Sequence, residues 1–289
     1  MVKTVNSVKR KVFFKNIPVS LIGRRLKIDG YAHNFKVVDR ELNNINLGNF
    51  GDKIKIITTF PSLNTSVCSL QVKKFNNELY KKSDDIVYLG ISKDLPFAQK
   101  VFCDDNNISN IILLSDYKYS SFGINYGLLI KELNLLARSA LIIDRNNVLR
   151  YLQIADETTN ELDYENILVN LEKIQNEPEI KSVETYPLNC VHDQEHTIPL
   201  SENKVNELLE DTTGWKLVND NKIIKYYLFS EHLDAKNLIE MINTIAEEQD
   251  HHPEITLNYN KIKIELTTHS ANGLTANDFI LAKIINELE

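Results

Sequence analysis

The stretch IKIITTFPSLNTSVC, residues 54–68, decides the fold of the first half of this 289-residue chain. Its first seven residues are mostly apolar, which predicts a buried strand ending at Phe60. Small hydroxyl and amide residues follow, and a helix that begins near Val67 would place Cys68 in its first turn. Backbone amides and the helix dipole stabilise a thiolate there, so Cys68 is either a nucleophile or a buried thiol that fills space.

Short apolar runs recur through the first 175 residues and alternate with amphipathic stretches. Residues 70–79 show the three- and four-residue apolar spacing of a helix packed on a sheet, and residues 164–174 predict a closing helix. The turn DRNN at 144–147 indicates a hairpin. Strands that alternate with helices predict an α/β layer fold. The expected strands are residues 54–60, 86–91, 111–114 and 140–143.

A change of composition separates this region from the rest of the chain. Residues 175–199 contain three prolines, many polar residues and no apolar periodicity, as is typical of a linker. We therefore predict a first domain over 1–176, a linker over 177–198 and a second domain over 199–289. The second domain reads as a small α+β domain of helices and paired antiparallel strands. Its expected helices are a helix from Ser201, 235–249 and a helix from about Asn277, and its expected strands are 215–218, 223–229, 255–259 and 262–266.

The bulk properties are those of an ordinary globular protein, with 43% hydrophobic and 25% charged residues. A net charge of −7 gives no reason to expect nucleic acid or an anionic membrane as a partner. The sequence shows neither the apolar stretch of a secretory signal nor a run long enough to span a bilayer. Three cysteines are too few for a disulfide scaffold. We therefore expect a cytoplasmic protein.

Four motifs in the first domain carry a family resemblance that extends from Val12 to about Ile174. They are PSLNTSVC at 61–68, SKDLPFAQKVFC at 92–103, LSDY with FGINYG at 114–127, and LLIKELNLLARSALIID at 128–144. With these motifs the domain resembles the thiol peroxidase subgroup of the atypical two-cysteine peroxiredoxins. The resemblance implies a thioredoxin-like fold and the thiol-dependent reduction of hydrogen peroxide and organic hydroperoxides, with a thioredoxin-like or other thiol as reductant.

The same resemblance implies a role for each of five residues. Cys68 would be the peroxidatic cysteine, and Cys103 would resolve its sulfenic acid as a disulfide. Thr65 would bond the peroxide, Pro61 would shield the sulfenic acid, and Arg138 would be the cation beside the thiolate. Peroxide cleavage needs a deprotonated sulfur, which a nearby guanidinium favours. Without the motifs, the cysteines would read as buried apolar residues, Thr65 as a helix N-cap and Arg138 as part of a surface or interface ion pair.

A second resemblance covers the chain from about Pro199 to Leu288. Its signature is Glu247, His251-His252-Pro253, Tyr259, His269 and Asp278 at permitted spacings, extended by TGWKLV at 213–218 and LTTHSANGLTANDF at 266–279. With these residues the domain resembles the pterin-4a-carbinolamine dehydratases. The resemblance implies that His251, His252 and His269 dehydrate a 4a-hydroxytetrahydropterin to a quinonoid dihydropterin. One imidazole would protonate the leaving hydroxyl and another would take the ring N–H proton, with no metal or other cofactor.

Asp278 has two readings, because a carboxylate three residues after Thr275 is also typical of a helix start. A metal reading of the histidines is weaker. Adjacent His251 and His252 point about 100° apart on a helix and are poorly placed to share one ion. The spacing of Cys190, His192 and His196 matches no strong zinc pattern, so a solvated segment is the better interpretation. We predict no redox role for Cys190.

The sequence thus predicts a bifunctional enzyme, a thiol peroxidase fused to a 4a-hydroxytetrahydropterin dehydratase. Peroxide and pterin are the expected substrates, an aromatic amino acid hydroxylase is a candidate partner, and both resemblances imply a homo-oligomer. The alternative is a peroxide sensor or redox relay joined to a dimerisation or binding module without turnover.

Overall fold

The computed structural model describes residues 3–4, 10–80, 83–177, 189–193 and 198–288. The chain divides into two compact units, one over residues 9–187 and the other over residues 188–289 together with 1–8. The boundaries at 176 and 199 stay predictions, because residues 178–188 and 194–197 lie outside the described part of the chain.

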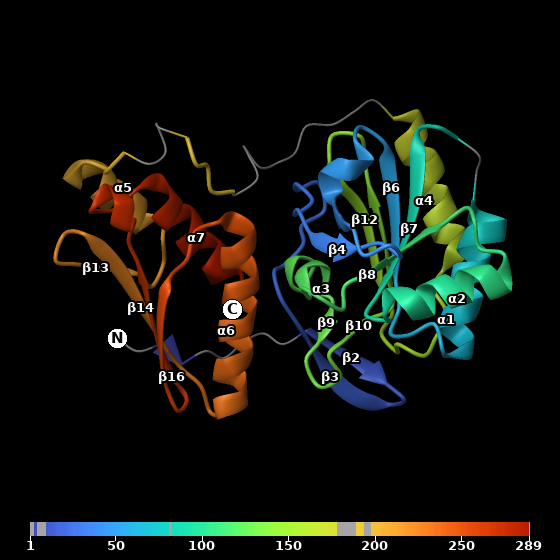
Figure 1. The fold of residues 1–289 in the computed structure, drawn as a ribbon, viewed down its shortest axis with the longest axis horizontal. Coiled ribbons are helices and arrows are strands. Elements are labelled where there is room, and N and C mark those ends of the chain that lie inside the picture. The colour runs from blue at the N-terminus through green and yellow to red at the C-terminus, as the bar shows by residue number, and fades with distance from the viewer. Residues whose placement is uncertain (1–2, 5–9, 81–82, 178–188, 194–197, 289) are drawn as a thin grey trace. The chain divides into compact units, whose positions relative to one another are not determined.

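A seven-stranded sheet organises the first unit (Figure 1). Its strands are β4 (Lys36–Val38), β5 (Asn44–Asn46), β6 (Ile54–Thr59), β7 (Ile86–Ser92), β8 (Ile112–Ser115), β11 (Ser139–Ile143) and β12 (Leu149–Ile154). They lie in the order β12-β11-β6-β7-β8-β4-β5, with β6, β7 and β8 parallel and antiparallel pairs on both sides. All residues of β6 are buried, as expected for a central strand covered on both faces.

Helices cover both faces of this sheet, with α1, α2 and α4 on one side and α3 on the other (Figure 1). They are α1 (Ser66–Lys74), η2 (Phe75–Leu79, a π-helical turn), α2 (Pro96–Asn106), α3 (Ser121–Asn125) and α4 (Tyr164–Asn176), and a 3₁₀ turn, η1 (Leu47–Phe50), precedes β6. The predicted α/β fold with its four strands is confirmed. The crossover helix begins at Ser66, one residue before the predicted start near Val67, because Thr65 is its N-cap.

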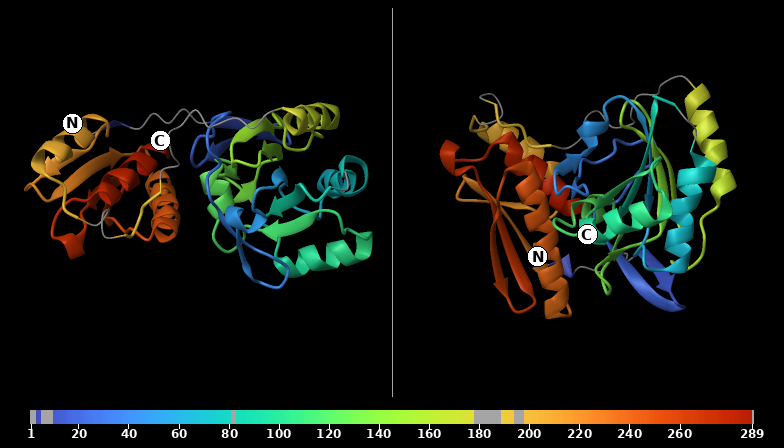
Figure 2. Two further views of the ribbon diagram at one scale, coloured as in Figure 1. Left: turned by 90° about the horizontal axis from the view of Figure 1, so that it is seen from above. Right: turned by 45° about the vertical axis from the view of Figure 1, so that its right-hand side comes forward.

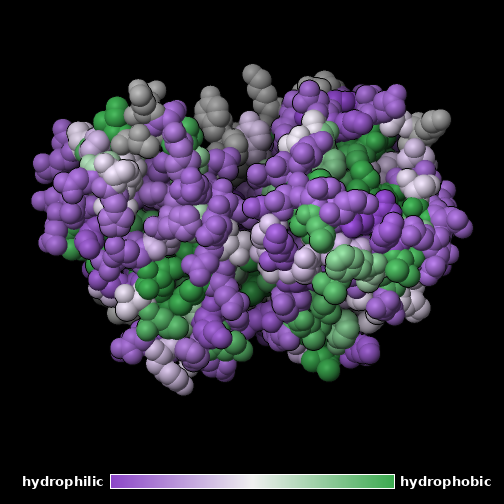
Figure 3. Space-filling view, in the orientation of Figure 1, coloured by the Kyte–Doolittle hydropathy of each residue, from purple (hydrophilic) through white to green (hydrophobic). Residues whose placement is uncertain are grey.

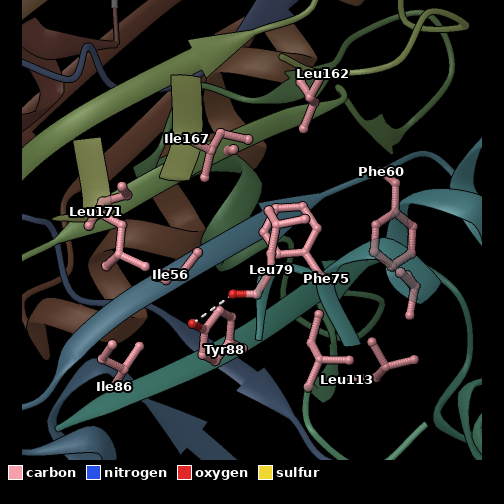
Figure 4. Close-up of a cluster of buried hydrophobic side chains, with 14 of the residues drawn as sticks. Ile56, Phe60, Phe75, Leu79, Ile86, Tyr88, Leu113, Leu162, Ile167 and Leu171 are labelled. Carbon is pink, nitrogen blue, oxygen red and sulfur yellow. Dashed lines mark hydrogen bonds between the residues drawn. The ribbon is translucent and has the colours of Figure 1, made fainter. Parts of the chain in front are cut away.

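The core of the first unit lies between the sheet and the helices α1, α2 and α4. Figure 4 shows Phe75 and Leu79 from η2 facing Tyr88 of β7, whose hydroxyl donates a hydrogen bond of 3.1 Å to the carbonyl of Leu79. Cys68 and Cys103 both belong to this apolar cluster. The two thiols therefore share one core.

A second, four-stranded sheet of the first unit was not predicted. Its strands are β2 (Arg10–Phe14), β3 (Ile17–Ile22), β9 (Leu129–Ile130) and β10 (Leu135–Leu136), in the order β10-β9-β3-β2. The turn between β2 and β3 has positive φ at Lys15 and Asn16, and the carboxylate of Glu157 accepts hydrogen bonds from both of their amides. This contact fixes the hairpin against the loop after β12.

The second unit contains a five-stranded sheet with helices on one face (Figures 1 and 2). Its strands are β1 (Lys3–Thr4), β13 (Lys216–Val218), β14 (Lys222–Leu228), β15 (Glu254–Asn258) and β16 (Lys261–Leu266), and its helices are α5 (Glu202–Glu210), α6 (His232–Gln249), η3 (His269–Ala271) and α7 (Ala276–Glu287). The order is β1-β14-β16-β15, with β13 also on β14, and only β1 among these described strands pairs in parallel. Burial alternates along β14 and β16, as in a sheet with one covered face. The predicted α+β domain is confirmed.

The surface is polar over most of the face shown in Figure 3, with separate apolar areas. Among the described residues, no helix is both long and apolar enough to cross a membrane.

Candidate active sites

Cys68 lies in the first turn of α1, as the sequence predicts. Thr65 is the N-cap in an extended conformation, and its hydroxyl oxygen accepts a hydrogen bond of 3.4 Å from the amide of Cys68. The same hydroxyl donates to the carbonyl of Ser62 at 3.2 Å. Cys68 is fully buried, and Pro61 is buried directly after the loop leaves β6. The N-cap reading of Thr65 is therefore confirmed, and its contact with peroxide stays a prediction.

Arg138 points its guanidinium at the sulfur of Cys68. Its Nη2 atom lies 3.3 Å from Sγ, its Nε donates to the carbonyl of Thr158 at 2.8 Å, and its Nη1 donates to the side-chain oxygen of Gln71. Arg138 is only 1% exposed, so the reading as part of a surface ion pair is wrong. A buried positive charge beside the sulfur stabilises the thiolate, which is the reactive form of a cysteine.

Gln71 is a site residue that the sequence analysis does not identify as functional. It lies one turn after Cys68 on α1, is fully buried, and accepts the hydrogen bond from Arg138. Its amide nitrogen donates to the hydroxyl of Thr58 and, at 3.1 Å, to the carbonyl of Thr59. Gln71 thereby fixes the guanidinium to β6. The available signal was an amide side chain at a helix position that faces the sheet.

The backbone on both sides of Arg138 is fixed by hydroxyl groups of β6. The hydroxyl of Thr59 donates to the carbonyl of Ala137 at 2.6 Å, and the hydroxyl of Thr58 donates to the carbonyl of Ser139 at 3.0 Å. The loop after β12 holds the far side of the guanidinium through Thr158. The amide of Thr158 donates to the carbonyl of Phe13 at 2.7 Å, so the β2–β3 hairpin supports the site from outside.

Cys103, the predicted resolving cysteine, lies in the last turns of α2 and is 4% exposed. Its thiol and that of Cys68 are both free. Burial raises the pKa of the Cys103 thiol, and the guanidinium of Arg40 opposes this through its charge and a hydrogen bond. Arg40 lies in the turn after β4, where the carboxylate of Asp39 accepts hydrogen bonds from the amides of Glu41 and Asn43. Arg40 was not predicted as a site residue.

His251 and Asp278 form the buried part of the second site. The Nε2 atom of His251 lies 2.9 Å from Oδ1 of Asp278, the carboxylate is fully buried and the imidazole is 11% exposed. Asp250 ends α6 in the left-handed conformation, with φ of 48°, and turns His251 toward α7. A buried carboxylate thus orients one imidazole.

The second carboxylate oxygen of Asp278 is held by the start of its own helix. It accepts hydrogen bonds of 2.8 Å from the amide of Thr275 and from the hydroxyl of Thr268, and Thr275 with Asp278 forms a capping box for α7. Asp278 therefore does two things at once: it belongs to the capping box at the start of α7, and it binds the imidazole of His251. Its part in catalysis stays a prediction. Thr268 was not predicted, although it directly precedes His269.

His252 and His269 are exposed, and each pairs with a carboxylate. The Nε2 atom of His252 lies 3.2 Å from Glu247, and that of His269 lies 3.3 Å from Glu254. Glu254 begins β15 just after the histidine pair, and the residue before His269 binds Asp278. These contacts bring the three predicted imidazoles to one end of the unit, where α6 ends and α7 begins. Imidazoles at such a site can both donate and accept protons near neutral pH.

The described residues contain no group of three or more His, Cys, Asp and Glu side chains that could hold a metal ion. Of the weaker metal candidates, His196 lies outside the described residues. The imidazole Nε2 of His192 lies 2.8 Å from the carbonyl of Gln249. Burial, with the charge of Asp278, raises the pKa of the Cys190 thiol to about 12. Such a thiol is a poor nucleophile at neutral pH.

Comparisons with known proteins agree with this geometry. Residues 28–168 match the family model described as Redoxin, and residues 198–288 match that described as Pterin 4 alpha carbinolamine dehydratase. The thiol peroxidase of Staphylococcus saprophyticus is 42% identical over 158 residues, which are 55% of this chain and 95% of that protein. This chain belongs to the thiol peroxidase family. It is a fusion, as predicted, because the second match adds a domain of the pterin dehydratase family to the thiol peroxidase domain.

Two solved structures resemble the two parts of the chain. A peroxiredoxin-like protein from Aquifex aeolicus is 36% identical, with a TM-score of 0.54, over 57% of this chain and 97% of that one. This likeness confirms the thioredoxin-like fold of the thiol peroxidase domain. A transcriptional coactivator/pterin dehydratase from Brucella melitensis is 33% identical over 31% of this chain and 97% of that one, with a TM-score of 0.30.

Replacing Gln71 should test how the guanidinium acts on Cys68. Gln71→Glu places a carboxylate beside the guanidinium of Arg138. The carboxylate partly neutralises that positive charge, so the guanidinium stabilises the Cys68 thiolate less. We expect Cys68 to react with hydrogen peroxide roughly ten to a hundred times more slowly, since a hydrogen bond to a charged group contributes about 1.5–3 kcal/mol. Rapid quenching, alkylation and peptide mass spectrometry measure this rate.

Gln99→Glu is the matched control for this variant. Gln99 is also fully buried and bonds the hydroxyl of Ser92 and the carbonyl of Leu114, but it lies on α2. Equal slowing in both variants would show that any buried charge has this effect and would contradict the assigned role of Gln71.

The raised pKa of Cys103 predicts a pH dependence for its reactivity. Because the pKa lies above its ordinary value, most of the thiol is protonated at neutral pH, so its alkylation rate should rise with pH beyond pH 8. In a Cys68→Ser background, Arg40→Met should move the midpoint of the curve of Cys103 alkylation rate against pH to higher pH. Lys100→Met, which removes a charge with a smaller effect on the Cys103 thiol, should move it less. A midpoint that stays or falls in Arg40→Met would contradict the contact.

Proposed function

We propose that this chain is a bifunctional enzyme, which reduces peroxides in its thiol peroxidase domain and dehydrates 4a-hydroxytetrahydropterins in its second domain. The observation that carries the first activity is the contact between the buried guanidinium of Arg138 and Cys68 in the first turn of α1. Hydrogen peroxide and organic hydroperoxides are the proposed substrates, and a thioredoxin-like or other thiol is the proposed reductant. Self-association and a cytoplasmic location stay predictions.

The peroxidase cycle follows from these groups. The Cys68 thiolate attacks one peroxide oxygen, the O–O bond breaks, and the departing oxygen takes a proton and leaves as water or an alcohol. In this proposal Thr65 orients the peroxide, and Arg138 stabilises negative charge as the bond breaks. Cys103 then attacks the sulfenic acid of Cys68, which releases water and forms the disulfide. An external dithiol returns both sulfurs to the reduced state with two electrons.

In the proposed dehydration, the protein takes part by proton transfer while the substrate loses its hydroxyl. The bond between the pterin ring carbon and its hydroxyl breaks as one imidazole gives a proton to the leaving oxygen. A second imidazole takes the proton from the ring nitrogen, so that water leaves and a double bond forms. The support for this assignment is the grouping of His251, His252 and His269, each beside a carboxylate, at one end of a domain of the pterin dehydratase family.

The peroxidase proposal is tested by intact and peptide mass spectrometry after one equivalent of hydrogen peroxide. We expect a loss of two hydrogens, localised to a bridge between Cys68 and Cys103, and the same product in Cys190→Ser. Cycling with a thiol reductant should continue over many turnovers. If Cys68 stays reduced, or forms an acid that Cys103 does not resolve, the two-cysteine cycle fails and a sensor becomes the better reading.

The dehydratase proposal is tested with His251→Ala. The wild-type chain should speed the appearance of quinonoid dihydropterin from a 4a-hydroxytetrahydropterin, and the variant should lose most of this activity while its molar mass in solution is unchanged. His232→Ala is the control, because His232 is an imidazole of the same domain that instead contacts the carbonyl of Tyr259. If the wild-type chain gives no acceleration, the second domain is a binding or assembly module.

A further inference from the structure

Part of the predicted linker is bound to the pterin dehydratase domain. Residues 189–192, here called the docked segment, belong to the same compact unit as that domain. The amide of Cys190 donates to the side-chain oxygen of Gln249 at 2.7 Å. The amide of Val191 donates to the side chain of Asn277 at 3.0 Å, and the carbonyl of Val191 accepts from the same side chain at 2.9 Å.

The two outer residues of the docked segment bind the same part of the domain. The imidazole of His192 lies 2.8 Å from the carbonyl of Gln249, and the side-chain oxygen of Asn189 accepts a weaker hydrogen bond of 3.4 Å from Gln249. Asn277 is 2% exposed, so its amide group has lost contact with water and uses the peptide of Val191 instead. A buried amide without such partners costs about 1–3 kcal/mol, so the segment is an integral part of this unit.

The contacts of the docked segment adjoin the proposed catalytic pair. Gln249 is the last residue of α6 and precedes His251 by two positions, and Asn277 directly precedes Asp278 in the first turn of α7. The docked segment therefore bridges the end of α6 and the start of α7. His251 follows the end of α6 and Asp278 lies at the start of α7, so the distance between these two helix ends determines whether the contact of 2.9 Å between them can form.

We propose that the docked segment is a positioning element of the dehydratase site, which holds the end of α6 against α7 so that Asp278 orients His251. The segment lies outside residues 198–288, which match the family model, so the sequence between the two domains supplies it. The proposal rests on the proposed dehydratase function. Cys190 and Val191 act through their backbone, since the side chains of Gln249 and Asn277 bind their amides and the carbonyl of Val191, and Val191 is 38% exposed.

Val191→Pro in the full chain removes one N–H donor and tests this proposal, and Val191→Ala is the matched control that keeps the donor. The first readout is the pair of ring ¹⁵N resonances of His251, which report whether Nε2 is bound to Asp278. Asp278→Asn serves as the reference for a weakened contact. In Val191→Pro the His251 resonances should move toward those of this reference, and in Val191→Ala they should stay at their wild-type positions. The second is kcat for dehydration, which should fall roughly tenfold or more in Val191→Pro while KM changes little.

The outcomes separate the positioning role from the activity itself. Unchanged His251 resonances and kcat in Val191→Pro would overturn the proposal. If the wild-type chain has no dehydratase activity, the proposed function fails, while the resonances still decide whether the segment orients His251. The fluorescence of Trp215, which is buried in this unit, reports whether each variant folds. If Val191→Pro does not fold, Gln249→Met decides instead, and wild-type resonances in that variant would overturn the proposal.

Discussion

The arrangement of the thiol peroxidase domain depends on one buried charge. Arg138 lies in the interior of the unit with its guanidinium directed at the sulfur of Cys68, and a cation in that place is tolerated only if its donors are satisfied. Gln71 and the carbonyl of Thr158 satisfy two of them, which ties α1 and the loop after β12 to the same group. A third donor, on Nη2, faces the thiol. The fold therefore supplies a positive site that a thiolate can neutralise.

The two cysteines differ in what their surroundings do to the thiol. Cys68 has helix amides and a buried guanidinium beside it, both of which favour negative charge. Cys103 has mainly apolar neighbours, which raise its pKa, and Arg40 only partly offsets them. In the proposed cycle, the thiol that attacks the peroxide and the thiol that attacks the sulfenic acid need different reactivities. The difference comes from the first turn of one helix and the interior face of another.

Local pattern was enough to predict the central strands, the crossover helix and the position of Cys68, because apolar spacing and an N-cap residue are properties of neighbouring residues. The family motifs added Arg138 and the three histidines. Gln71, Thr268, Arg40 and the docked segment were not predicted from the sequence. Gln71, Arg40 and the docked segment act through partners far away in the sequence, and Thr268 acts through a carboxylate ten residues later. A buried amide, a hydroxyl or a backbone N–H leaves no periodic signal. The β2–β3 hairpin was missed for the same reason, since Glu157 fixes its turn from more than a hundred residues away.

The pairing of β1 with β14 changes how the two domains are connected. Residues 3 and 4 lie beside Tyr227 and Leu228 in the sheet of the second unit, so that unit contains residues from both before and after the peroxidase unit. In the sequence, the thiol peroxidase unit is thus inserted within the second unit rather than simply preceding it. The chain therefore passes between the two units twice instead of once, so a single cut between them would leave them joined covalently.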